Sequence, residues 1–178
     1  MRKQTIGDHF YMDGWIDSSP IGELVIGDYV VLGHGARIIA HGPIRPWKYQ
    51  RIEIGDLCYI GDNVRILLGA KIGRGCVIGT LSVVGEEIPA FSIAAGNPVR
   101  VIRIRDPYEI LRTFVLKYRE PYPKVLGTVT EPNWDLLTFK DVAYVLDGYP
   151  KPLPPIGAMT MQDFLDSLRR ANREWRAI

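Results

Sequence analysis

Residues 54–85 read IGDLCY IGDNVR ILLGAK IGRGCV IGTLSV VG, so that an aliphatic residue opens each block of six. The aliphatic positions of this series are Ile54, Ile60, Ile66, Ile72, Ile78 and Val84, and upstream Ile26, Leu32 and Ile38. Glycine follows most of them, and a small or β-branched residue lies two places before most of them. A period of six matches neither an α-helix nor a simple alternating strand, so the repeat itself predicts the fold.

A six-residue repeat predicts a mainly β fold, a left-handed parallel β-helix whose coils are triangular and contain three hexads each. Each hexad supplies a short strand and a corner, and its aliphatic side chain points into a narrow core. Equivalent residues one coil apart, such as Ile54 and Ile72, should stack at about 4.8 Å. Each such buried side chain contributes roughly 1.5–3 kcal/mol. A chance alternation of aliphatic residues in a β-sandwich would not place the glycines and the small residues at fixed distances from the aliphatic positions.

The residues at the corners of this prism lead to two further predictions. The glycines after the aliphatic residues are expected to adopt dihedrals that other residues disfavour. Asp28, Asp56 and Asp62 stand beside them, where short polar side chains can hydrogen-bond local backbone.

The repeat is interrupted once, because Ile54 follows Ile38 after sixteen positions instead of six. The additional residues must leave the prism, and we expect an extruded loop over residues 40–51. Long loops on repeat scaffolds are usually functional or disordered. The stretch 5–20 is expected to form a less regular first coil, with Ile6 and Met12 at hexad spacing.

The composition changes after residue 104, which divides the chain into a β-helix domain over 1–104 and a partly helical extension over 105–178. Asp106 can cap a helix that runs to about residue 119, with Pro107 in its first turn. A second helix is expected from Thr160 to about residue 177, where Thr160 and Asp163 resemble a capping box. Between these helices the sequence is rich in proline and aromatic residues and shows no period.

The bulk composition is ordinary, with 47% hydrophobic and 24% charged residues and a formal net charge of +2. This balance favours neither a nucleic-acid partner nor a membrane. The chain lacks an apolar run near the roughly 18 residues that span a bilayer and shows no signal-peptide core at residues 1–8. We therefore expect a cytoplasmic protein. Cys58 and Cys76 lie eighteen residues apart and should stack in one column, where a disulfide could form but two buried thiols are expected.

The sequence resembles the hexapeptide-repeat acetyltransferases, the group of galactoside, maltose and xenobiotic acetyltransferases. The matching stretches are 54–56, 59–64, 70–73, 77–79, 82–84 and 93–103. The last stretch is the most specific, because Ala-Gly-Asn-Pro at residues 95–98 followed by Val-Ile-Arg at 101–103 is much rarer than a bare hexad. The similarity covers about residues 20–104.

The resemblance implies a homotrimer that binds acetyl-CoA between neighbouring prisms and transfers the acetyl group to a hydroxyl or amine of a small acceptor such as a sugar. It implies that a histidine of the extruded loop acts as general base, which assigns this role to His41. The implied coenzyme-binding residues are Asp62, Thr80, Gly85, Arg100 and Arg103. The two arginines could pair with coenzyme phosphates.

The sequence departs from the family pattern at three places. His41 lies only three residues after Ile38, Tyr59 stands where tryptophan is common, and Gly85-Glu86 replaces a common Thr-Lys. Because Glu86 removes a positive charge near the coenzyme, a non-catalytic trimeric scaffold is the first alternative function.

The second alternative is a zinc protein like the γ-class carbonic anhydrases, because residues 31–36 resemble a piece of that family. His34 and His41 are separated by six residues rather than the four of its ligand pair, so no metal ligand is assigned. His34 and His9 are expected to be exposed turn residues.

Overall fold

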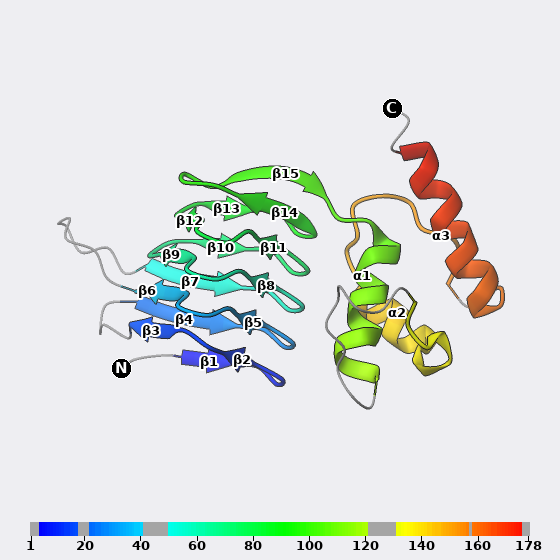
Figure 1. Cartoon of the computed structure of the whole chain (residues 1–178), viewed down its shortest axis with the longest axis horizontal. Helices are drawn as coiled ribbons and strands as arrows, with labels where there is room; N and C mark the ends of the chain where they lie inside the picture. The colour runs from blue at the N-terminus through cyan, green and yellow to red at the C-terminus, as the bar shows by residue number, and fades with distance from the viewer. Residues whose placement is uncertain (1–3, 18–21, 41–49, 121–130, 157, 176–178) are drawn as a thin grey trace. The chain divides into compact units, whose positions relative to one another are not determined.

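The computed structural model describes residues 4–17, 22–40, 50–120, 131–156 and 158–175 (Figure 1). The chain forms two compact units, Met1–Ile104 and Arg105–Ile178. The first unit is built of short strands and the second of helices.

The strands of the first unit form the three faces of a prism. The first face contains, in spatial order, β1 (Gln4–Ile6), β4 (Gly22–Ile26), β7 (Gln50–Ile54), β10 (Lys71–Ile72) and β13 (Glu87–Ile88). The second contains β2 (Tyr11–Met12), β5 (Val31–Leu32), β8 (Tyr59–Ile60), β11 (Val77–Ile78), β14 (Ser92–Ala95) and β15 (Arg100–Ile104). The third contains β3 (Trp15–Asp17), β6 (Arg37–Ile39), β9 (Arg65–Leu67) and β12 (Val83–Val84).

Successive coils stack in the register that the repeat predicts. Ile72 pairs with Ile54, Ile78 with Ile60 and Val84 with Ile66, all in parallel strands. Among the described strands, only the pair β14–β15 is antiparallel. Figure 1 shows the coils as layers that follow the chain from β1 to β15.

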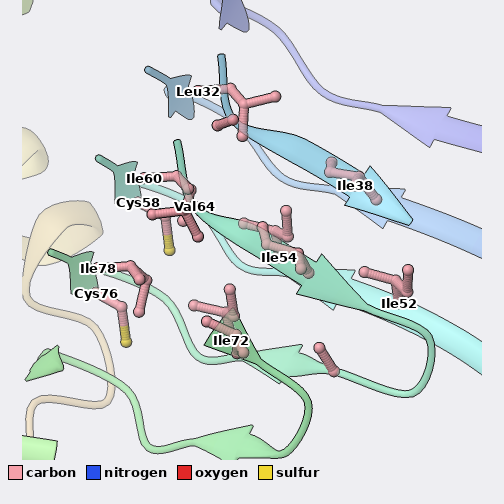
Figure 2. Close-up of a cluster of buried hydrophobic side chains, with 14 of the residues drawn as sticks. Leu32, Ile38, Ile52, Ile54, Cys58, Ile60, Val64, Ile72, Cys76 and Ile78 are labelled. Atoms are coloured by element: carbon pink, nitrogen blue, oxygen red, sulfur yellow. The ribbon is translucent and has the colours of Figure 1, made fainter. Parts of the chain in front are cut away.

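The core of the prism is a set of aliphatic columns. The residues from Ile54 to Val84 in the hexad phase are at most 2% exposed. The small residues two places earlier, including Val64 and Ala70, are also buried, so each hexad contributes two inward positions. Figure 2 shows Ile60 and Ile78 pointing into the same interior, one coil apart. The predicted inward series is confirmed.

The two cysteines occupy one of these columns. Cys58 and Cys76 are both buried, and no disulfide joins them. Their sulfurs lie 3.2 Å from the carbonyl oxygen of Gly73 and 3.1 Å from that of Pro89. The predicted pair of buried thiols, one coil apart, is confirmed (Figure 2).

The prediction about the hexad glycines is wrong in its physical reason. Left-handed φ values occur two places after these glycines, for example at Leu57 (61°) and Asn63 (55°). The glycines themselves are required by the next coil, because a Cβ at Gly61 would lie 2.7 Å from the backbone nitrogen of Thr80. The stacking distance between coils therefore excludes a side chain at these corners.

The corner aspartates bond to backbone as predicted, but in the neighbouring coil rather than locally. Asp28 Oδ1 accepts a hydrogen bond from the backbone N–H of Asp8 (2.7 Å). Asp56 Oδ1 accepts one from the N–H of Asp28 (3.0 Å), so the bonds form a column along the corner. The carboxylates thus tie successive coils together.

The two ends of the prism differ. In the first coil the inward residues Ile6 and Met12 are 43% and 45% exposed. At the other end Ala94 and Val99 are fully buried members of the core, and β15 turns back along β14. The first coil is therefore the open end of the core and the last coil is closed.

The second unit contains α1 (Pro107–Phe114), a π-helical turn (Val115–Arg119), a 3-10 turn (Trp134–Leu136), α2 (Phe139–Val145) and α3 (Met161–Trp175). Asp106 caps α1 by accepting from the N–H of Tyr108 (2.7 Å). Thr160 Oγ1 accepts from the N–H of Asp163 (3.1 Å), so the two predicted helix starts are confirmed. None of the helices that the structure describes is long and apolar enough to cross a membrane.

One carboxylate joins three segments of the second unit. Glu131 accepts hydrogen bonds from Tyr108 Oη (3.0 Å), Trp134 Nε1 (3.2 Å) and Arg169 Nη2 (2.9 Å). The Arg169 guanidinium also lies over the Tyr108 ring, 4.5 Å from its centroid. Burial of the Tyr108 hydroxyl raises its pKa. This network fixes α1 to α3.

Candidate active site

The predicted site residues lie along the third face of the prism and at its closed end. Asp62 and Thr80 occupy the corner between the second and third faces, in neighbouring coils. Gly85 follows β12, at the corner between the third and first faces. Arg100 and Arg103 lie on β15, the last strand of the second face. The structure thus brings these residues to two corners and one end strand.

Asp62 and Thr80 form part of one corner column. Asp62 Oδ1 accepts a hydrogen bond from the backbone N–H of His34 (3.0 Å), and the Asp62 carbonyl accepts one from the N–H of Leu81 (2.9 Å). Both side chains are exposed. One carboxylate oxygen of Asp62 is therefore used to tie two coils together, while the Thr80 hydroxyl stands on the outer surface of the next coil.

Arg100 and Arg103 are three residues apart and would point to opposite sides of a regular strand. The pairing of β15 with β14 shifts its register between Ile93 and Ala94, so that Arg100 faces Ala95 and Arg103 faces Ile93. Ile93 and Ala95 are two apart and belong to the same side of β14. The irregularity therefore brings the two arginines to one side of the sheet, as a β-bulge does.

Gly85 differs from the other hexad glycines. A Cβ at Gly85 would meet only Leu67 side-chain atoms, the nearest at 3.5 Å, which is an ordinary contact distance. Packing between coils therefore does not require glycine here. The residue after it, Glu86, lies with its carboxylate Oε1 3.2 Å from Nη1 of Arg100, and both side chains are exposed. Nothing in the hexad pattern signals this ion pair.

The predicted general base, His41, lies outside the described residues. The residue before it, Ala40, is buried and donates its N–H to the carbonyl of Asp17 (3.4 Å). The predicted loop 40–51 extends too far, because β7 already begins at Gln50. Residues 40–49 connect β6 to β7, that is, the third face to the first face. The connection β12–β13, with Gly85 and Glu86, spans the same corner of the prism two coils further on.

The other two histidines are surface residues, as predicted. His34 is exposed, and its Nδ1 lies 3.1 Å from Asp13 Oδ2. The His9 ring stacks on Tyr29 with 4.4 Å between ring centroids. Within the part of the chain that the structure describes, no group of three or more His, Cys, Asp or Glu residues could hold a metal ion.

A prism of stacked hexad coils with parallel strands on three faces is the left-handed β-helix of the hexapeptide-repeat class. No family model matches the chain. Among curated proteins, the chain is 32% identical over 85 residues to the "Putative acetyltransferase YvoF" of Bacillus subtilis, an alignment that covers 47% of this chain and 49% of that one. The chain thus spans about half the length of this curated relative.

Two solved structures are also similar. A galactoside acetyltransferase in complex with coenzyme A is 30% identical with a TM-score of 0.52, over 68% of this chain and 62% of that one. The hexapeptide-repeat-containing acetyltransferase VCA0836 of Vibrio cholerae is 29% identical with a TM-score of 0.50, over 57% and 62% of the two chains. These similarities confirm both the resemblance to hexapeptide-repeat acetyltransferases and the fold that the sequence predicts.

Proposed function

We propose that this protein is a coenzyme A-dependent acyltransferase that moves an acetyl group from acetyl-CoA to a hydroxyl or amine of a small acceptor such as a sugar. One observation carries the proposal: two arginines share one side of β15, on a prism similar to that of acetyltransferases. The solved galactoside acetyltransferase binds coenzyme A. In this proposal residues 1–104 are the catalytic domain and 105–178 an extension to it.

The proposed reaction uses His41 as the general base. The imidazole takes a proton from the acceptor while the acceptor oxygen or nitrogen attacks the thioester carbonyl carbon. The C–S bond then breaks, and coenzyme A leaves as a thiol with the proton that His41 held. Arg100 and Arg103 would pair with phosphates of the coenzyme, because a guanidinium binds phosphate through paired N–H groups.

Asp62, Thr80 and Gly85 would line the coenzyme along the third face. The exposed Thr80 hydroxyl can donate to, or accept from, an amide of the pantetheine arm. The bare backbone of Gly85 leaves room for a ligand to approach closely. A cytoplasmic location belongs to the same proposal, because two buried thiols without a disulfide fit a reducing compartment.

We further propose that the protein acts as a homotrimer with a coenzyme site between neighbouring prisms. Three large apolar side chains near the closed end are strongly exposed, Leu81 (70%), Val101 (45%) and Ile102 (65%), which suits burial against another chain. Light scattering at micromolar concentration should give three times the chain mass of 20.1 kDa. A monomeric mass would refute this part of the proposal.

The principal test is His41→Ala. Turnover, measured as acetyl-CoA consumption with a panel of sugar and amine acceptors, should fall by roughly 10²–10⁴. Coenzyme binding should persist, because the general base acts on the acceptor rather than on the donor. The matched control is His34→Ala, since His34 is an exposed corner residue and should change activity only slightly. Full activity of the His41 variant would remove the assignment.

A thermal-shift assay separates the proposed function from its two alternatives. Coenzyme A at about 100 times its dissociation constant should stabilise an acyltransferase by about 2.7 kcal/mol. A non-catalytic scaffold, which the Glu86–Arg100 ion pair favours, should show no shift. A zinc protein should instead lose stability when a chelator removes its metal.

A further inference from the structure

Glu86 and Arg100 form an ion pair that is held in place by the backbone on both sides. The Glu86 carbonyl accepts from the N–H of Lys71 (3.4 Å), and the N–H of Val99 donates to the carbonyl of Val83 (3.1 Å). Arg100 Nη1 also donates to the Val99 carbonyl (2.8 Å), in addition to its contact with Glu86 Oε1 at 3.2 Å. Both partners therefore extend from anchored backbone at the closed end of the prism.

The Glu86–Arg100 pair is exposed to solvent, and it lies next to Gly85, a glycine that no neighbouring coil covers closely. The Glu86 and Arg100 side chains are 59% and 69% exposed, so an incoming anion can reach the guanidinium. Gly85 precedes Glu86 and leaves its backbone uncovered, although the adjoining coil would tolerate a side chain there. Surface ion pairs of this kind are weak, so a phosphate can displace the carboxylate.

We propose that Glu86 sets the donor specificity of the site by opposing the binding of phosphate at Arg100, an inference that rests on the proposed acyltransferase function. A donor phosphate that pairs with Arg100 must displace the Glu86 carboxylate and then remain near its negative charge. The electrostatic repulsion between the Glu86 carboxylate and the phosphate rises with the negative charge of that phosphate. The Glu86 carboxylate therefore lowers the affinity for coenzyme A, which has a 3′-phosphomonoester on its ribose, more than the affinity for dephospho-coenzyme A, which lacks it.

The test is to measure dissociation constants of coenzyme A and of dephospho-coenzyme A by calorimetry, for the wild-type chain and for Glu86→Gln. The substitution keeps the side-chain size and removes the charge. We expect Glu86→Gln to bind coenzyme A roughly three- to tenfold more tightly, with a smaller change for dephospho-coenzyme A. The gain should shrink at high salt, since exposed charges are screened.

The matched control is Glu87→Gln, which removes the same charge one residue away. The Glu87 carboxylate pairs with Lys71 Nζ (3.4 Å) on the first face, so it does not contact Arg100. Its loss should leave both dissociation constants within about twofold of the wild type.

The outcomes separate the inference from the function on which it rests. Equal affinities for the wild type, Glu86→Gln and Glu87→Gln would overturn the role of Glu86 while leaving the acyltransferase proposal intact. An equal gain for both coenzymes would also overturn it, because the effect would not depend on the phosphate. No binding of either coenzyme to any of the three chains, together with no acetyl transfer, would refute the proposed function itself.

Discussion

The middle coils of the prism and its first coil contain the same repeat, but only the middle coils bury it completely. Ile60 lies in register between Leu32 and Ile78 and is fully buried. Met12 belongs to the same column and pairs with Leu32, but no described strand lies on its other side, and it is 45% exposed. A hexad residue is therefore stabilised by the coils on both sides of it, as expected for a structure in which each repeat contacts only its neighbours.

The largest expected effect comes from emptying one position of that column. Ile60→Ala should lower the free energy of unfolding by about 2–5 kcal/mol, because it removes buried methylenes and leaves a cavity between two coils. Met12→Ala in the first coil should cost less than about 1 kcal/mol, since the side chain is half exposed. Urea unfolding followed by circular dichroism measures both. Equal losses would show that the first coil is as well packed in solution as the middle ones.

A smaller effect is expected from adding one carbon between coils. Gly61→Ala would place a Cβ 2.7 Å from the Thr80 nitrogen and 2.8 Å from the Ile78 carbonyl oxygen, and backbone cannot move aside easily. We expect a loss of roughly 1–3 kcal/mol. Gly85→Ala is the control, because its nearest contact at 3.5 Å is ordinary; thermal denaturation should show a change within about 0.5 kcal/mol.

The smallest effect concerns the hydrogen bonds between coils. Asp56→Ala removes the acceptor for the N–H of Asp28 (3.0 Å) and should cost about 1 kcal/mol. Asp8 stands at the same corner in the first coil, where no described coil lies beneath it, and Asp8→Ala should be nearly neutral. If chemical denaturation gives the two variants the same stability, the carboxylate column does not contribute to the stacking of the coils.

The sequence predicts the β-helix in detail because the same repeat that defines the strands also determines which residues pack in the core. Every sixth residue must enter a core of fixed width, so the pairing of Ile54 with Ile72 follows from the hexad period alone. The reason for the glycines cannot be obtained in this way. It depends on the distance between coils, which a single hexad does not contain. The left-handed positions two places later carry glycine at some corners, as at Gly75, but not at Leu57 or Asn63.

The second unit is less predictable, because its helices are short and their signals are local. The caps at Asp106 and Thr160 are sufficient to predict the starts of α1 and α3. The sequence pattern does not predict α2, although Thr138 and Asp141 form a capping box at its start. In that part of the sequence the many proline and aromatic residues obscure a helix of seven residues.

For the candidate site, the sequence predicts residue types but not their mutual arrangement. The spacing of Arg100 and Arg103 suggests opposite sides of a strand, and only the register shift against β14 brings them to one side. The Glu86–Arg100 contact joins residues that are fourteen positions apart in the sequence, one before β13 and the other at the start of β15. Neither the shared side of the two arginines nor the ion pair follows from the hexad period, because the period ends at Val84, before these residues.

The reversal of β15 has a consequence for how copies of this chain can assemble. A prism whose two ends both offered parallel strands could add further prisms head to tail without limit, because such a contact does not close on itself. Here one end offers an antiparallel strand, which does not continue the parallel order of the open end. An edge strand of opposite direction therefore does not extend the parallel stack, which disfavours head-to-tail addition of a further prism at this end.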